Sequence, residues 1–191
     1  MRFQILTLAS AVLTAASPVA QVTADPVSAL TSPPDVYSAG NIEQRVDSVV
    51  TVAGQTLAKV QQLRSGTNIQ IIGPAIVEHF GKLSEKNAAG SVVFNIIPAY
   101  DYSTEDQQKI CASYEQLLTL EYQIVKAFFD HAKLTTGTNF QGHLHAQLRV
   151  FQGSIDKYNK GLVKQLPVCA DDVQNEYIKL AATTQLAISL I

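Results

Sequence analysis

The stretch NFQGHLHAQLRVFQGSIDKYNKGLVKQLP, from Asn139 to Pro167, decides the fold class of this chain. Apolar side chains recur in it at every third or fourth residue, a period that gathers them on one face of an α-helix. Pro167 is expected to stop the helix, because proline has no N–H to continue it. The apolar face consists of Phe140, Leu144, Leu148, Phe151, Ile155, Tyr158, Leu162 and Leu166. Such a face must be buried, either against other helices alone or also against an apolar ligand.

The same period recurs on both sides of this stretch. It predicts helices over residues 41–64, 104–134 and 171–190. The connections between the last three helices are short, and short connections favour antiparallel neighbours. We therefore expect an all-α fold, an up-and-down antiparallel helical bundle of four to five helices.

The segment between Pro74 and Pro98 carries a weaker helical pattern. Pro74 suits the first turn of a helix, where a missing N–H costs little, and Pro98 would end it. The middle, KNAAGS at 86–91, is a poor helix-forming sequence. One long helix, a loop over 88–98, or a β-strand at VVFNII (92–97) all remain open from the sequence.

Short polar residues stand at the expected helix starts, where their side chains can accept hydrogen bonds from free backbone N–H groups. The spacing of Thr138 and Gln141 fits a capping box. The other expected caps are Asn41, Ser103 or Thr104, and Asp171 or Asp172.

The N-terminal residues have the pattern of a secretory signal peptide. Arg2 precedes an apolar run over 5–16, which is followed by small residues. We expect a signal peptide over 1–20, with cleavage between 16 and 24; a buried N-terminal helix is the alternative. The run is too short to span a bilayer, so no transmembrane segment is expected. A Pro-containing flexible arm over 21–40 would then lead to the helical-bundle domain at 41–191.

Composition narrows the classes of function. The chain has 191 residues, 47% of them apolar and 16% charged, with a net charge of −2. This charge gives no electrostatic reason to expect nucleic acid as a partner. No GxSxG, P-loop, GxGxxG after a strand or CxxC motif is present. His143 and His145 are two residues apart, so on a helix they cannot bind one metal together. We expect no enzyme activity, metal or cofactor.

The two cysteines are predicted to form a disulfide. Cys111 lies near the start of the third predicted helix, and Cys169 lies just past the end of the fourth. If those helices are antiparallel, both cysteines lie at the same end of the bundle. An even number of cysteines in a secreted chain favours a bridge.

Glu121 is the polar residue that points most directly to a site. It lies between Leu117 and Ile124 on an apolar helix face. A buried carboxylate must be paired, protonated or able to reach water. It is therefore either an edge residue or the polar rim of an apolar pocket. The candidate lining is Phe80, Tyr114, Leu117, Glu121, Ile124, Phe128, Leu144, Leu148, Phe151, Ile155 and Tyr158.

Three glycines interrupt the helix over Asn139–Pro167, each costing about 1 kcal/mol against alanine. Gly142 and Gly153 lie opposite the apolar face, so neither would hollow the core. Gly142, Gly153 and Gly161 are either tolerated surface glycines or places where another helix comes close.

Two runs carry a family resemblance: STEDQQKICASYEQLLTLEYQIVKAFFDHAKL at 103–134 and TNFQGHLHAQLRVFQGSIDKYNKGLVKQLP at 138–167. They resemble the fungal hydrophobic surface-binding protein A family, which overlaps with the fungal cell-wall mannoproteins. The pattern extends over 41–190 but is specific only in 103–167, and no binding residue transfers by motif. The two cysteines are not a feature that the resemblance explains.

The resemblance implies a secreted or cell-wall protein that binds hydrophobic surfaces or, as in some mannoprotein relatives, holds a fatty acid inside a helical bundle. The expected partner is a long-chain fatty acid or another apolar ligand or surface. The alternative is a helical-bundle interaction module, such as an effector or an inhibitor of a cell-wall enzyme, with a protein partner outside the cell.

Overall fold

The computed structural model describes residues 37–64, 66–97, 100–135 and 137–191. The predicted signal peptide and most of the predicted arm lie outside these residues. The described helices are α1 (Ala39–Val60), α2 (Ile69–Ile96), α3 (Thr104–Asp130), α4 (Ala132–Thr135), α5 (Asn139–Val163) and α6 (Ala170–Leu190). Within the described residues there is no strand, and the predicted all-α bundle is confirmed.

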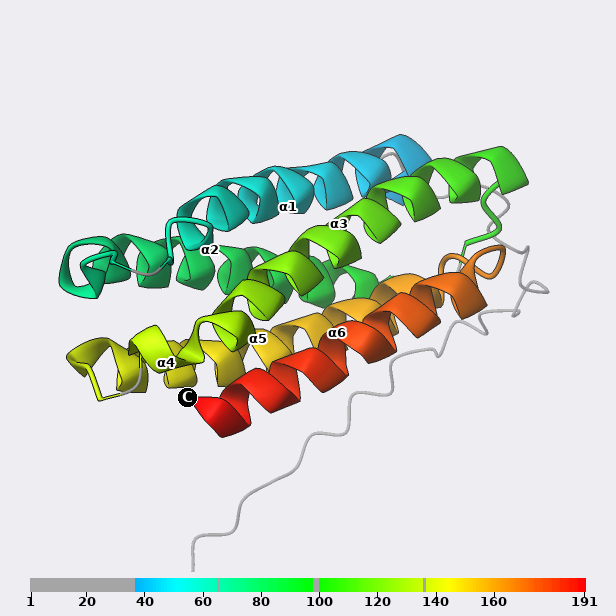
Figure 1. The fold of residues 1–191 in the computed structure, drawn as a ribbon. Coiled ribbons are helices and arrows are strands. Elements are labelled where there is room, and N and C mark those ends of the chain that lie inside the picture. Colours follow the sequence, from blue (N-terminus) through cyan, green and yellow to red (C-terminus); the bar gives the residue numbers. More distant parts are fainter. Residues whose placement is uncertain (1–36, 65, 98–99, 136) are drawn as a thin grey trace, which may run out of the picture.

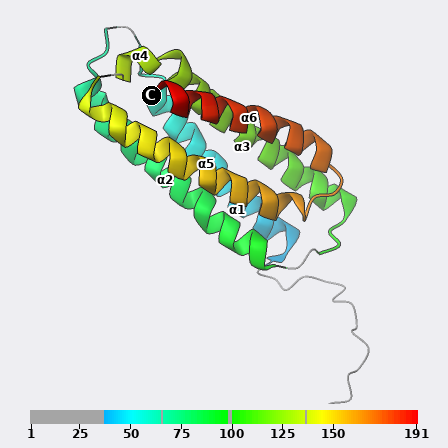
Figure 2. The ribbon, with the colours of Figure 1, turned by 90° about the horizontal axis from the view of Figure 1, so that it is seen from below.

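Five long helices alternate in direction along the chain, and α4 is a single turn between α3 and α5 (Figure 1). The bundle has two layers: α1 lies beside α3, and α2 lies beside α5 (Figures 1 and 2). Helix α6 runs along the side and packs against α3 and α5. None of the helices in the described ranges is both long and apolar enough to cross a membrane.

The most extensive packing joins helices that run in the same direction, α2 with α5 and α1 with α3. Short connections do produce an antiparallel pair at α5 and α6. Helices α3 and α5 are also antiparallel, but they belong to different layers and face each other across the core, where the rings of Tyr114 and Tyr158 meet. The expectation that consecutive helices are direct neighbours is therefore only partly correct.

Helix α2 resolves the ambiguity of the 74–98 segment. It is continuous from Ile69 to Ile96, so neither a loop nor a strand interrupts it. Pro74 lies inside the helix rather than in its first turn. Tertiary packing supports the continuous helix, because the rings of Phe80 and Phe94 contact Phe151 and Tyr158 of α5.

The helix caps agree with the sequence only in part. Ser38, not Asn41, caps α1, whereas Ser103 caps α3 as expected by accepting from the backbone N–H of Asp106 at 3.1 Å. Thr138 precedes α5 but makes no capping bond with its side chain. The acidic pair Asp171 and Asp172 lies in the first turn of α6, where negative charge suits the helix dipole.

Three glycines allow α2 and α5 to come close together. A Cβ at Gly73 would lie 2.9 Å from the ring of Phe140, and one at Gly161 would lie 2.8 Å from Cβ of Phe94. A Cβ at Gly90 would also clash with the ring of Tyr158. For Gly161, the close approach of another helix is therefore the correct interpretation.

Exchanging glycine for alanine should have opposite effects at Gly90 and Gly153. Gly90→Ala should lower the free energy of unfolding by about 1–3 kcal/mol, because the buried ring of Tyr158 has little room to move. Nothing lies within 4 Å of a Cβ at Gly153, so Gly153→Ala should stabilise the helix by about 1 kcal/mol. Urea unfolding of the two variants measures both. An equal change in the free energy of unfolding in both variants would show that helix propensity alone determines the effect of the alanine.

One end of the bundle is tied by many bonds, and we name it the closed end. The predicted disulfide joins Cys111 to Cys169, with their Cα atoms 6.3 Å apart. The hydroxyl of Tyr102 donates to the carbonyl of Tyr37 at 2.7 Å. The side chain of Gln107 donates to the Tyr102 carbonyl at 2.9 Å and accepts from the Val168 N–H at 3.2 Å.

Candidate functional site

Every residue of the predicted lining lies in the core of the bundle. Helices α3 and α5 contribute opposing faces across the core, and Phe80 of α2 contacts both. Its ring centroid is 5.3 Å from that of Phe128 and 4.8 Å from that of Phe151. The structure thus brings the candidates together from three helices. The other buried members are Tyr114, Leu117, Glu121, Ile124, Leu144, Leu148, Ile155 and Tyr158.

Glu121 is a core residue and not an edge residue, since only 2% of it is exposed. The amide nitrogen Nδ2 of Asn87 donates to its Oε1 at 2.6 Å. Burial raises the pKa of Glu121 from its usual 4.5 to about 8, and the hydrogen bond from Asn87 opposes this rise. At neutral pH most molecules therefore carry Glu121 as an uncharged acid, which can donate a hydrogen bond.

Two buried polar atoms close to this acid have no hydrogen-bond partner among the described residues: Oδ1 of Asn87 and the hydroxyl of Tyr158. Leaving such an atom unpaired in a core costs about 1–3 kcal/mol. Burial, and after it the charge of Glu121, raises the pKa of Tyr158 well above its usual value. The tyrosine therefore keeps its proton, and its hydroxyl remains a free donor.

Tyr114 has a similar environment but is fully paired. Its hydroxyl donates to Oδ1 of Asn159 at 2.7 Å, and Nδ2 of Asn159 donates to Oε1 of Gln174 at 3.0 Å. The two tyrosine rings lie 5.9 Å apart, so they belong to one cluster. Hydrogen bonding therefore distinguishes the two tyrosines: the hydroxyl of Tyr114 is bonded within the protein, whereas that of Tyr158 can bond to a ligand.

We name Glu121, Asn87 and Tyr158 the polar cluster. It combines a neutral acid, a free carbonyl oxygen and a free hydroxyl inside an apolar core. A carboxyl group is complementary to this set, because it can accept from Glu121 and Tyr158 and, when protonated, can donate to Asn87.

The apolar part of the candidate site is buried in this structure. Five hollows in the described part of the chain lie at its surface, and none is lined by a candidate residue. An alkyl chain would therefore have to separate the α1–α3 layer from the α2–α5 layer to lie between them.

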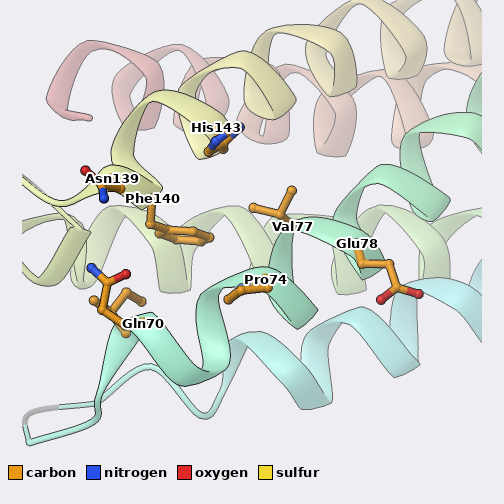
Figure 3. A pocket seen from close by; sticks show the side chains of 8 residues that line it. Gln70, Pro74, Val77, Glu78, Asn139, Phe140 and His143 are labelled. Atoms are coloured by element: carbon orange, nitrogen blue, oxygen red, sulfur yellow. The ribbon is translucent and has the colours of Figure 1, made fainter.

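The sequence pattern missed two parts of the molecule that could have a function. Asn87 falls on the buried face of α2, but its link to Glu121 spans 34 residues and no helical period reveals it. The second part is a surface groove of about 400 Å³ between the N-terminal parts of α2 and α5 (Figure 3). We name it the α2–α5 groove; it is lined by Ile69, Gln70, Pro74, Val77, Glu78, Asn139, Phe140 and His143.

No group of three or more His, Cys, Asp or Glu side chains in the described ranges could hold a metal ion. His143 lines the groove, whereas its neighbour His145 does not. Placing the two histidines on different sides of α5 agrees with their spacing of two residues.

Comparison with known proteins shows a similar fold but no similar sequence. No protein-family model matches the sequence, and no curated protein matches it. Among solved structures, the chain is similar to AfMP4p in complex with palmitic acid, with a TM-score of 0.68 and 12% sequence identity. The match covers 80% of this chain and 99% of AfMP4p. At this identity the likeness shows a shared fold and not membership of a family by sequence.

Proposed function

We propose that this protein is a secreted, non-catalytic binder of a long-chain fatty acid. It holds the alkyl chain between the two helical layers, with the carboxyl group at the polar cluster. The observation that carries the proposal is the pair of unpartnered buried atoms, on Asn87 and Tyr158, beside the neutral acid of Glu121. The palmitic acid bound by AfMP4p, which has the same fold, supports this ligand class.

The polar cluster explains why a fatty acid would be preferred to a hydrocarbon. An apolar ligand would leave Asn87 Oδ1 and the Tyr158 hydroxyl unpaired, whereas a carboxyl group pairs them. Burial of the alkyl chain supplies the rest of the affinity, roughly 0.8 kcal/mol for each methylene removed from water.

Titration of the mature protein with palmitic acid, followed by native mass spectrometry and calorimetry, tests this function. We expect a stoichiometric complex and saturable binding. Palmityl alcohol, which has the same chain, is the matched control and should bind more weakly because it offers fewer acceptor oxygens. A bare protein mass and no saturation would refute the function.

Two tyrosine variants locate the carboxyl group. Tyr158→Phe should weaken palmitic acid binding by roughly 2- to 10-fold, the worth of a hydrogen bond between neutral groups. It should not lower the stability of the free protein, because the hydroxyl it removes has no partner. Calorimetry measures the affinity, and urea unfolding measures the stability.

Tyr114→Phe is the control, with the opposite expectation. It removes a donor to Asn159, so the free energy of unfolding should fall by about 1–3 kcal/mol while the affinity for palmitic acid stays the same. Unchanged affinity in Tyr158→Phe, in a protein that does bind palmitic acid, would move the carboxyl group away from the polar cluster.

Adsorption to a hydrophobic surface or a protein partner is the second candidate function. Large aliphatic side chains along the outer face of α6 favour it: Ile178, Leu186 and Leu190 are each about half exposed. If palmitic acid does not bind, this face becomes the leading candidate, and binding to hydrophobic beads would measure it.

A further inference from the structure

The α2–α5 groove lies at the end of the bundle opposite the closed end. Helices α2 and α5 both begin there, and they run side by side in the same direction (Figures 1 and 2). Gln70, Glu78, Asn139 and His143 supply its polar groups, and the remaining lining is apolar.

Phe140 separates this groove from the core. Its ring lies in the gap between α5 and α2, opposite Pro74 and Val77 (Figure 3). Only 7% of Phe140 is exposed, although it lines a surface groove. The ring fits because Gly73 has no side chain, as a Cβ there would lie 2.9 Å from ring atom Cδ2.

The face of α5 that begins at Phe140 continues directly into the proposed alkyl-chain site. Leu144 is one turn further along the same face, and Tyr158 of the polar cluster follows Phe140 by 18 residues. At the helical rise that separation is about 27 Å, which is about the length of an extended fatty acid of 22 carbons. A chain whose carboxyl group lies at Tyr158 therefore points toward Phe140 with its methyl end.

The N-terminal part of α2, which lies beside Phe140, can bend more easily than a regular helix. Pro74 has no N–H, so the carbonyl of Gln70 receives no helical hydrogen bond from it. A helix is more easily bent at such a position. The closed end, by contrast, is held by the disulfide and by the hydrogen bonds of Gln107.

We propose that Phe140 sets the upper length of the alkyl chain: it closes the core at the methyl end, and the α2–α5 groove behind it is unused space for a longer chain. This inference rests on the proposed function and makes Phe140 a residue that determines specificity. Fatty acids longer than the preferred length would have to displace its ring into the groove.

The test measures dissociation constants for saturated fatty acids from C16 to C26. Phe140→Ala should raise the affinity for C26 relative to C22 by at least roughly tenfold, because each additional buried methylene is worth about a fourfold change in affinity. Phe140→Leu should act in the same direction with a smaller shift, and it keeps an apolar side chain over Gly73. Val77→Trp added to Phe140→Ala should refill the groove and reverse the effect.

Ile97→Ala at the closed end is the matched control, since Ile97 is 6% exposed and its truncation also removes buried apolar atoms. It should leave the ratio of C26 to C22 affinity unchanged. An unchanged ratio in both Phe140 variants, or an equal change in Ile97→Ala, would overturn the inference. Failure of the unmodified protein to bind any chain length would instead refute the proposed function.

Discussion

The free energy of unfolding of the unmodified protein should fall as the pH rises from about 4.5 to 8, and Glu121→Gln should abolish this fall. The folded state holds the Glu121 proton up to about pH 8, whereas the unfolded chain releases it near 4.5. Between these values the folded state binds more protons, so the free energy of unfolding falls with rising pH. The contribution is fully present below 4.5 and is lost above 8.

The expected magnitude is large for one side chain. The slope is about 1.4 kcal/mol per pH unit and sums to roughly 5 kcal/mol over this window. Urea unfolding at several pH values measures the free energy of unfolding of the unmodified protein and of Glu121→Gln. The contributions of the other titrating groups cancel in the difference between the two proteins. Glu115→Gln is the control, because Glu115 is an exposed acid on the same helix and should leave the slope unchanged.

A slope in Glu121→Gln equal to that of the unmodified protein would mean that Glu121 is ionised in the folded state. The polar cluster would then carry a negative charge, and Glu121 could not donate a hydrogen bond to the carboxyl group of a fatty acid. Glu121→Leu adds an independent check: it should raise stability at pH 8 because it removes a buried acid, and it should weaken palmitic acid binding. The pH experiment therefore tests the electrostatic basis of the proposed function without any ligand.

The sequence predicts four of the five long helices, α1, α3, α5 and α6, because each must bury an apolar face, and burial imposes a period of 3.6 residues. The same rule obscured the middle of α2. Gly90 weakens the local helical signal, yet a residue without a side chain is what the ring of Tyr158 requires there. Local propensity and tertiary packing conflict at this glycine, and packing prevails.

The candidate site was predictable only in part, for a related reason. Opposing faces of two antiparallel helices follow from their periods, so the sequence identifies Glu121, Tyr114 and Tyr158 as possible neighbours. It cannot show which of the two tyrosines has a hydrogen-bond partner. The bond from Tyr114 to Asn159 depends on side-chain conformations, which a helical period does not determine. The α2–α5 groove depends on two parallel helices lying side by side, and no period or connection length indicates that arrangement.

Removing the disulfide should cost about 4 kcal/mol of stability. The bridge joins residues 58 positions apart, and closing a loop of that length lowers the entropy of the unfolded chain. Cys111→Ala combined with Cys169→Ala should lower the free energy of unfolding by this amount in urea titrations. The unmodified protein under reducing conditions should lose a similar amount, which separates the bridge from the packing of the cysteine side chains.

The location of the bridge makes a second outcome of this variant informative. It fixes the start of α3 to the α5–α6 connection at the closed end, whereas Phe140 closes the opposite end. If Phe140 alone sets the chain length, the double cysteine variant should keep the same ratio of C26 to C22 affinity in conditions where it stays folded. A ratio that moved toward longer chains would show that the closed end also limits the alkyl chain, and the carboxyl group would then have to lie elsewhere than at Tyr158.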